Sequence, residues 1–138
     1  LENNTLMTIP DGRDDQQGLF LNQIVASGGG YNPLVYEGLV KLDVRLPFLL
    51  AVDSVHFEAI RGYDEDFTGI AFDDNDLVER LQLYGLNYHS TGARIVHLFH
   101  PRHVSNTGMN EEWHYNYQLY LARRNILVRN LNREWGRL

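Results

Sequence analysis

The hydrophobic positions of this chain repeat most regularly after residue 75. Leu77, Leu81 and Tyr84 recur at the spacing i, i+4 and i+7, and Val78 widens the apolar stripe. Gly85 stands where such a helix would stop. The pattern predicts an amphipathic helix of about three turns.

Three acidic residues, Asp73, Asp74 and Asp76, stand at the start of this predicted helix. Helix N-termini favour carboxylates because their amides are unpaired and the helix dipole is positive there, so we expect Asp73 or Asp74 to be the N-cap. Carboxylates this close also repel, which raises their pKa values unless a cation or a catalytic role compensates. Helix capping and a functional site are therefore both open interpretations.

Shorter patterns predict the remaining elements. An aromatic and basic stripe with acids at its start predicts a long helix from residue 110 to about 133. The other predictions are a strand at 6–10, a polar loop at 11–17, a short helix at 18–26, a strand covered on both faces at 47–55, a short helix at 56–60, and strand-like pieces at 87–88 and 94–99. Mixed elements of this kind predict an α/β fold.

Composition limits the class of protein. A chain of 138 residues with 43% hydrophobic residues is long enough for one domain with a core. Its net charge of −6 argues against a nucleic-acid binder, which needs a basic surface. No apolar run approaches the roughly 20 residues that cross a bilayer, and there is no secretory leader or cysteine, which favours the cytoplasm. Contact of the 110–133 helix with a membrane surface stays open, and the missing initial methionine suggests a piece of a longer protein.

A second candidate group is the segment His97-Leu-Phe-His-Pro-Arg-His103. Neighbouring strand residues face opposite ways, so His97 and His100 can share a site only if the strand ends between them, and Pro101 favours such an end. Imidazoles bind divalent metals, so either histidine is a candidate ligand beside the acids. A zinc site made of the three histidines alone is the alternative, although the spacing matches no strong zinc motif.

As a set, these motifs resemble the carboxy-terminal half of GT-A fold, nucleotide-sugar-dependent glycosyltransferases, especially the large inverting family two, and are similar to the galactosyltransferase carboxy-terminal domain. The likeness runs from about Pro47 to Arg102, with a weaker echo at 120–125. The family's Gly-Gly-Phe-Asp-Glu is matched by residues 61–65, RGYDE, and its Glu-Asp-x-Asp-Leu-x-x-Arg is matched by residues 73–80, DDNDLVER.

The resemblance implies a GT-A-like, partial Rossmann-type mixed sheet flanked by helices, with a long C-terminal helix. It implies that Asp74 is the catalytic base, that Asp73 binds the acceptor, and that His97, or alternatively His100, completes a Mn²⁺ or Mg²⁺ site. Asp76 would position acceptor hydroxyls or the helix. The implied activity is inverting, metal-dependent transfer from a UDP- or GDP-sugar to a glycan or other hydroxyl acceptor, as in polysaccharide biosynthesis.

The chain departs from the family at several points. Asp73 replaces a Glu, and Phe72 stands where Trp is usual. The family's donor-binding half has no counterpart, although DGRDD at 11–15 resembles a degenerate Asp-x-Asp. We therefore expect a single domain with a connecting segment at 1–46, catalytic motifs at 47–103 and a helical segment at 104–138, and a fragment that is inactive without the missing N-terminal half.

Aromatic residues near the acids are candidate sugar platforms. Tyr63, Phe72 and Trp113 can stack on the C–H faces of an acceptor, although core packing is the favoured interpretation for Tyr63 and Phe72. Two other functions stay open. One is a catalytically inactive module that binds a glycan or a protein, and the other is a small metal-dependent hydrolase.

Overall fold

A computed structural model describes residues 4–8, 11–42, 49–101 and 106–136. His103 and the first residues of the predicted 47–55 strand lie outside these ranges. The predicted α/β class is confirmed, whereas the GT-A arrangement stays a prediction. The helices are α1 (Leu19–Ala26), α2 (Pro33–Glu37), α3 (Ser54–Ala59), α4 (Asp73–Tyr84) and α5 (Asn106–Arg123), and the strands are β1 (Thr5–Thr8), β2 (Asp11–Asp14), β3 (Val40–Leu42), β4 (Leu50–Ala51), β5 (Asn87–Ser90) and β6 (Arg94–His97).

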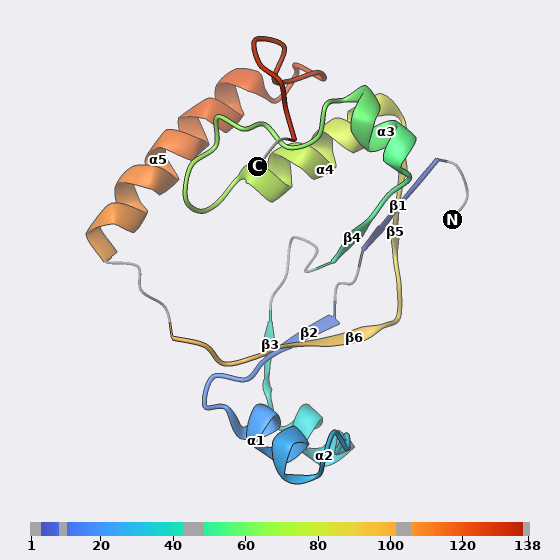
Figure 1. Cartoon of the computed structure of the whole chain (residues 1–138), viewed down its shortest axis with the longest axis vertical. Helices are drawn as coiled ribbons and strands as arrows, with labels where there is room; N and C mark the ends of the chain where they lie inside the picture. The colour runs from blue at the N-terminus through green and yellow to red at the C-terminus, as the bar shows by residue number, and fades with distance from the viewer. Residues whose placement is uncertain (1–3, 9–10, 43–48, 102–105, 137–138) are drawn as a thin grey trace. The chain divides into compact units, whose positions relative to one another are not determined.

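The chain forms two compact units. Unit 1 comprises residues 1–7, 50–89 and 103–138, and unit 2 comprises residues 8–49 and 90–102. Unit 1 contains the sheet β4-β1-β5 with α3, α4 and α5, and unit 2 contains the sheet β3-β2-β6 with α1 and α2 (Figure 1). Neither unit coincides with one of the predicted segments. No helix in the described ranges is long and apolar enough to cross a membrane.

The core of unit 1 lies between α4 and the segments packed on it. Six buried apolar residues form one cluster: Leu6, Ile60, Leu77, Val78, Leu81 and Leu86. Leu50, Val52, Phe57 and Leu127 pack against its edge. The predicted apolar stripe of α4 therefore supplies half of the buried cluster, and Gly85 ends the helix with φ of 113°, a conformation that glycine adopts without strain.

The predicted start of α4 needs one correction. Asp73 and Asp74 are in the first helical turn, and Phe72 occupies the N-cap position with φ of 69° and no side-chain cap. The Phe72 ring stacks on Tyr120 of α5, with centroids 5.5 Å apart. Tertiary packing therefore fixes the start of the helix at a residue that intrinsic capping preference would not select.

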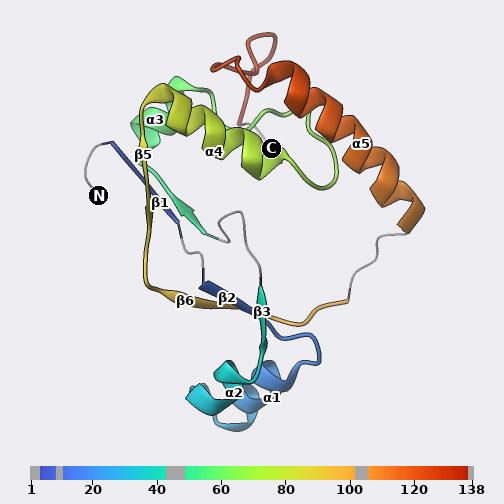
Figure 2. The ribbon, with the colours of Figure 1, turned by 180° about the vertical axis from the view of Figure 1, so that it is seen from behind.

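The predicted long C-terminal helix is present, but it ends at Arg123 rather than near residue 133. The chain then folds back toward α3 and α4 (Figures 1 and 2). Leu127 packs against the unit 1 core, and Arg129 and Asn130 are buried. The apolar positions after Arg123 continued the helical repeat in the sequence, but they are used by an irregular segment.

Two strand predictions also need correction. The segment at 11–17 contains β2 rather than only a loop, and β2 pairs antiparallel with β3 and parallel with β6. The strand predicted at 47–55 is reduced in the described residues to β4, a half-buried strand at the edge of its sheet. It cannot continue because Asp53 caps α3 by accepting a hydrogen bond from the Val55 amide at 3.1 Å.

Candidate functional site

The acidic start of α4 holds one carboxylate in a distinctive setting. The Tyr63 hydroxyl donates a hydrogen bond to Asp74 Oδ1 at 3.0 Å. No described side chain or backbone group donates a hydrogen bond to Asp74 Oδ2. Tyr63 comes from the loop between α3 and α4, and Asp74 comes from the first turn of α4. The fold therefore orients one oxygen of Asp74 and leaves the other available.

This setting shifts both pKa values. Burial is the main cause that raises the pKa of the Asp74 carboxyl, and the charge of Asp73 adds to the increase, whereas the hydrogen bond from Tyr63 opposes it. Burial, followed by the charge of Asp74, raises the pKa of Tyr63 to about 12. Tyr63 is therefore a hydrogen-bond donor at neutral pH, and Asp74 is a stronger base than an ordinary aspartate.

Asp76 has a different role. It is only 1% exposed, and it accepts hydrogen bonds from Arg80 at 2.7 Å and from Arg129 at 3.0 Å. Its carboxylate is thus occupied by two guanidinium groups and cannot reach an acceptor hydroxyl. Of the two roles that the sequence suggested for Asp76, the structure supports the positioning of the helix. Of the three crowded acids, this leaves Asp73 and Asp74 as candidates.

The loop before α4 is held by a buried amide from α5. The Asn116 side chain is 1% exposed, and its Nδ2 donates to the carbonyls of Thr68 and Ile70 at 2.8 Å and of Ala71 at 3.0 Å. Its Oδ1 accepts from the Thr68 amide at 3.1 Å. No sequence pattern predicted this role, because Asn116 lies within a helix and contacts a loop more than 40 positions away.

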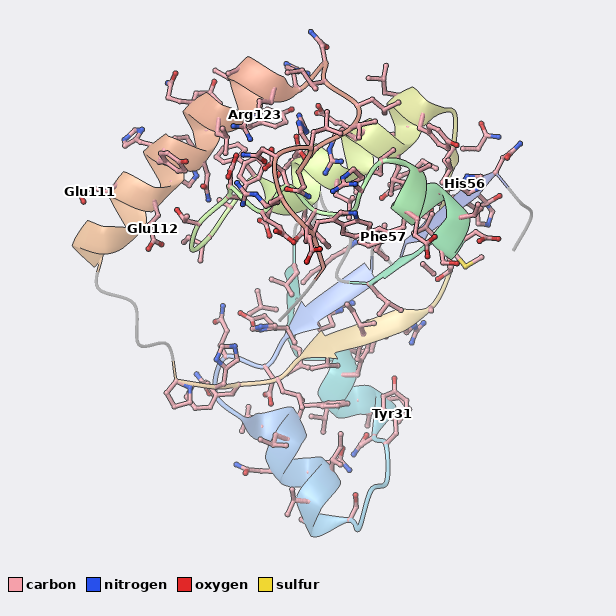
Figure 3. The ribbon with its side chains drawn as sticks, turned by 45° about the horizontal axis from the view of Figure 1, so that its top comes forward. Tyr31, His56, Phe57, Glu111, Glu112 and Arg123 are labelled. Atoms are coloured by element: carbon pink, nitrogen blue, oxygen red, sulfur yellow. The ribbon has the colours of Figure 1, made fainter. Side chains whose placement is uncertain are left out.

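Three of the four residues from Gly69 to Phe72 have a left-handed backbone conformation. Gly69, Ala71 and Phe72 have φ of 66°, 78° and 69°. Non-glycine residues in this conformation store strain, which persists only where surrounding contacts impose it, as Asn116 does here. A Cβ atom at Gly69 would lie 1.9 Å from Glu112 Oε2, so the α5 carboxylate packs directly on the loop (Figure 3). From the sequence, Glu112 was only one of the acids at the start of the long helix, and its contact with this loop was not predicted.

Trp113 lies in an aromatic cluster next to the acids. Its ring stacks on Tyr117 with centroids 5.2 Å apart and meets the edge of Phe72 at 5.0 Å. Trp113 is 40% exposed, so part of its surface is available to a ligand. Phe72 immediately precedes Asp73 in the chain, so the cluster adjoins the acidic turn.

A network of ion pairs holds the loop that carries Tyr63. Arg123 binds the buried Asp64 at 2.9 Å and Asp66 at 2.7 Å, and Arg133 also pairs with Asp66. The Asn130 side chain donates to the carbonyls of Arg61 and Tyr63. These contacts join residues far apart in the chain, and no pattern in the sequence predicted them.

The two candidate histidines lie together in unit 2. The strand β6 ends at His97, so the side chains of His97 and His100 are not forced onto opposite faces of one strand. Their rings have centroids 5.2 Å apart. The parallel register of β2 and β6 places Asp14 beside His97, and His97 Nδ1 lies 3.1 Å from Asp14 Oδ1. These residues line a cleft of about 620 Å³ together with Asp15 and neighbouring residues.

This cleft does not hold a complete metal site by itself. Asp15 is buried, and its two carboxylate oxygens accept hydrogen bonds from the Phe20 and Leu21 amides, so it caps α1. Within the described ranges, no group of three or more His, Cys, Asp or Glu side chains could hold a metal ion. The acids of α4 belong to unit 1, and the histidines belong to unit 2. A cation bound by His97 or His100 would need ligands in addition to those of this cleft.

One comparison with known proteins bears on this region. Residues 48–104 match the model of a family described as the N-terminal domain of galactosyltransferase. Comparison with curated proteins and with solved structures found no significant match. The matched stretch covers less than half of the chain and contains Tyr63, Asp73, Asp74 and both histidines. It indicates a glycosyltransferase-like domain of the galactosyltransferase type.

Proposed function

We propose that this chain forms the acceptor side of an inverting glycosyltransferase, in which Asp74 is the catalytic base. The observation that carries the proposal is the half-buried Asp74 carboxylate with its raised pKa, held by Tyr63 at the start of α4. The galactosyltransferase-type match over the same stretch supports the class of reaction.

In the proposed step, the acceptor hydroxyl oxygen attacks the anomeric carbon of a nucleotide-sugar. The bond between that carbon and the diphosphate oxygen breaks, and its electrons leave with the nucleoside diphosphate. Asp74 Oδ2 takes the hydroxyl proton, while Tyr63 holds Oδ1. Asp73, which follows Phe72 in the chain, and the exposed part of Trp113, whose ring meets the Phe72 ring, contact the acceptor, a glycan or another hydroxyl compound.

The donor is a UDP- or GDP-sugar, and Mn²⁺ or Mg²⁺ would stabilise the leaving diphosphate when bound. His97 or His100 is the proposed ligand from this chain. Because the cleft around these histidines supplies only part of a coordination shell, the assignment of Asp74 is made independently of the metal.

The test measures sugar transfer by the full-length protein with a panel of UDP- and GDP-sugars, before and after Asp74→Asn. Asparagine keeps the shape of the side chain but cannot accept the proton, so kcat should fall by about 10²–10⁴-fold with an unchanged circular dichroism spectrum. Glu58→Gln, an exposed carboxylate on α3 outside the site, is the matched control and should leave kcat unchanged.

Turnover of Asp74→Asn at the wild-type rate would refute the assignment. Binding of donor and glycan by the wild-type protein without any transfer would instead establish the alternative, a catalytically inactive glycosyltransferase-like module.

A further inference from the structure

A second groove of unit 2 lies on the face of β6 opposite to His97. Side chains alternate along a strand, so Arg94 and Val96 face one way and His97 faces the other. The groove has a volume of about 670 Å³ and runs between β6 and the helices α1 and α2. Its apolar and aromatic walls are formed by Phe20, Ile24, Tyr31, Tyr36, Val96 and Leu98. Tyr31 is seen beside α2 in Figure 3.

Among the residues that the structure describes, Arg94 is the one charged residue that lines this groove. Its guanidinium lies 3.5 Å from Glu37, and Arg13 lies 3.4 Å from the same carboxylate. The Glu37 carboxylate is therefore shared by two guanidinium groups, so it does not neutralise Arg94 alone, and Arg94 also lies over the Tyr36 ring at 5.5 Å. An anionic group of a ligand would be favoured at this position.

The segment that supplies Phe20, Ile24, Tyr31 and Tyr36 to the groove carries no charge. Residues 16–36 include no Asp, Glu, Lys, Arg or His, although 22% of the whole chain is charged. Several apolar side chains of this segment are exposed, among them Val25 at 72% and Leu34 at 83%. An apolar groove within an uncharged surface, next to a cationic residue, is suited to a molecule with an apolar body and an acidic end.

We infer that this groove binds a single amphiphile with an apolar chain and an anionic head group. The chain lies along Phe20, Ile24, Val96 and Leu98, and the head group pairs with Arg94. A neutral amphiphile lacks an anionic group that could pair with Arg94, and a free anion lacks an apolar chain that could fill the groove, so both should bind more weakly. This site does not depend on the proposed sugar transfer.

Titration calorimetry of the full-length protein with octyl, decyl and dodecyl phosphate, each below its micelle-forming concentration, tests the inference. The dissociation constant should fall about fourfold for each added methylene until the groove is filled. Inorganic phosphate and dodecyl maltoside should each bind much more weakly than dodecyl phosphate.

Two pairs of variants localise the binding. Arg94→Gln should weaken dodecyl phosphate binding about tenfold, whereas Lys41→Gln, an exposed cation outside the groove, should not. Leu98→Ser should weaken binding, whereas the more exposed Leu34→Ser should not.

Three results would overturn the inference. One is equal affinity for octyl and dodecyl phosphate, and another is equal weakening by Leu98→Ser and Leu34→Ser. The third is binding to vesicles of anionic lipid without binding of monomeric dodecyl phosphate, because it would indicate contact with a membrane surface rather than occupation of the groove.

Discussion

The two units of this protein are stabilised in different ways. Unit 1 combines an apolar cluster with buried polar groups, of which Asp76, Arg80 and Asn116 are almost fully enclosed. In the described part of unit 2, few apolar side chains are buried, and the helices expose large ones such as Val25 and Leu34. Buried, fully paired polar groups fix one geometry. In unit 1 these groups hold the backbone on both sides of the Tyr63–Asp74 pair in one geometry, through Arg80 to the Gly62 carbonyl and Asn116 to the Ala71 carbonyl, whereas unit 2 exposes an apolar surface.

The largest effect on stability should come from the buried ion pairs of unit 1. Asp76→Ala leaves Arg80 and Arg129 buried without their carboxylate, and it should lower the free energy of unfolding by about 4 kcal/mol. In unit 2, Glu37→Ala removes an exposed carboxylate whose partners, Arg13 and Arg94, keep access to solvent, and it should change the free energy of unfolding by less than about 0.5 kcal/mol. Urea denaturation of both variants measures the contrast, and similar values for the two would remove the distinction between the units.

The second largest effect on stability should come from Asn116, whose side chain is hydrogen-bonded to the loop at 68–71. Asn116→Ala removes four hydrogen bonds from the loop at 68–71, at about 1 kcal/mol each or somewhat less, so unfolding should become easier by roughly 3 kcal/mol. Gln118→Ala, at an exposed position of the same helix, is the control and should have little effect. If hydrogen exchange of the 68–72 amides is the same in Asn116→Ala and in Gln118→Ala, Asn116 does not hold the strained loop.

The buried ion pairs of Asp76 and the hydrogen bonds of Asn116 could not be predicted from the sequence, whereas part of the fold could. The helical repeat predicted α4 correctly, because its stripe consists of local, regularly spaced apolar positions that face a core. The same rule extended α5 too far, because Leu127 is apolar at a helical spacing but packs on the core from an irregular segment. Periodicity reports which side chains are buried, and it does not report which backbone conformation buries them.

The site was predictable in part for the same reason. A run of acids at a helix start marks a candidate locally, and this marked Asp73 and Asp74. Three contacts of this region join positions more than 40 residues apart: Asp76 with Arg129, Asn116 with the loop at 68–71, and Glu112 with Gly69. A single sequence carries no signal for such distant pairs, so the acids that serve structure could not be separated from those that are available for chemistry.

An alkaline titration gives a smaller effect in unit 1. The folded state raises the pKa of Tyr63 to about 12, whereas an unfolded tyrosine has a pKa of about 10. Because folding favours the protonated phenol, this stabilisation is complete below about pH 10 and is lost as the pH rises toward 12. In Tyr63→Phe, the free energy of unfolding should therefore fall less between pH 10 and 12 than in the wild-type protein, whereas Tyr115→Phe, at an exposed position, should behave like the wild type. Urea denaturation across this pH range measures the difference. An identical pH dependence in both variants would contradict the assigned environment of Tyr63.

The smallest effect is expected on the apolar surface of unit 2. Leu34→Ser changes a side chain that is 83% exposed, so the free energy of unfolding should change by less than about 0.5 kcal/mol. By comparison, Leu77→Ala in the unit 1 core should cost about 3 kcal/mol. Thermal unfolding measures both, and a cost above about 1 kcal/mol for Leu34→Ser would show that this surface is covered within the protein.

The pH dependence of kcat/KM for sugar transfer tests the role of Asp74 most directly. The base must be ionised, so the rate should fall on the acid side, with a midpoint above the value of about 4 that is ordinary for aspartate. Tyr63→Phe removes the hydrogen bond that lowers the Asp74 pKa, so the midpoint should move to higher pH. An acid limb that stays in place in Tyr63→Phe, or that persists unchanged in Asp74→Asn, would contradict the account.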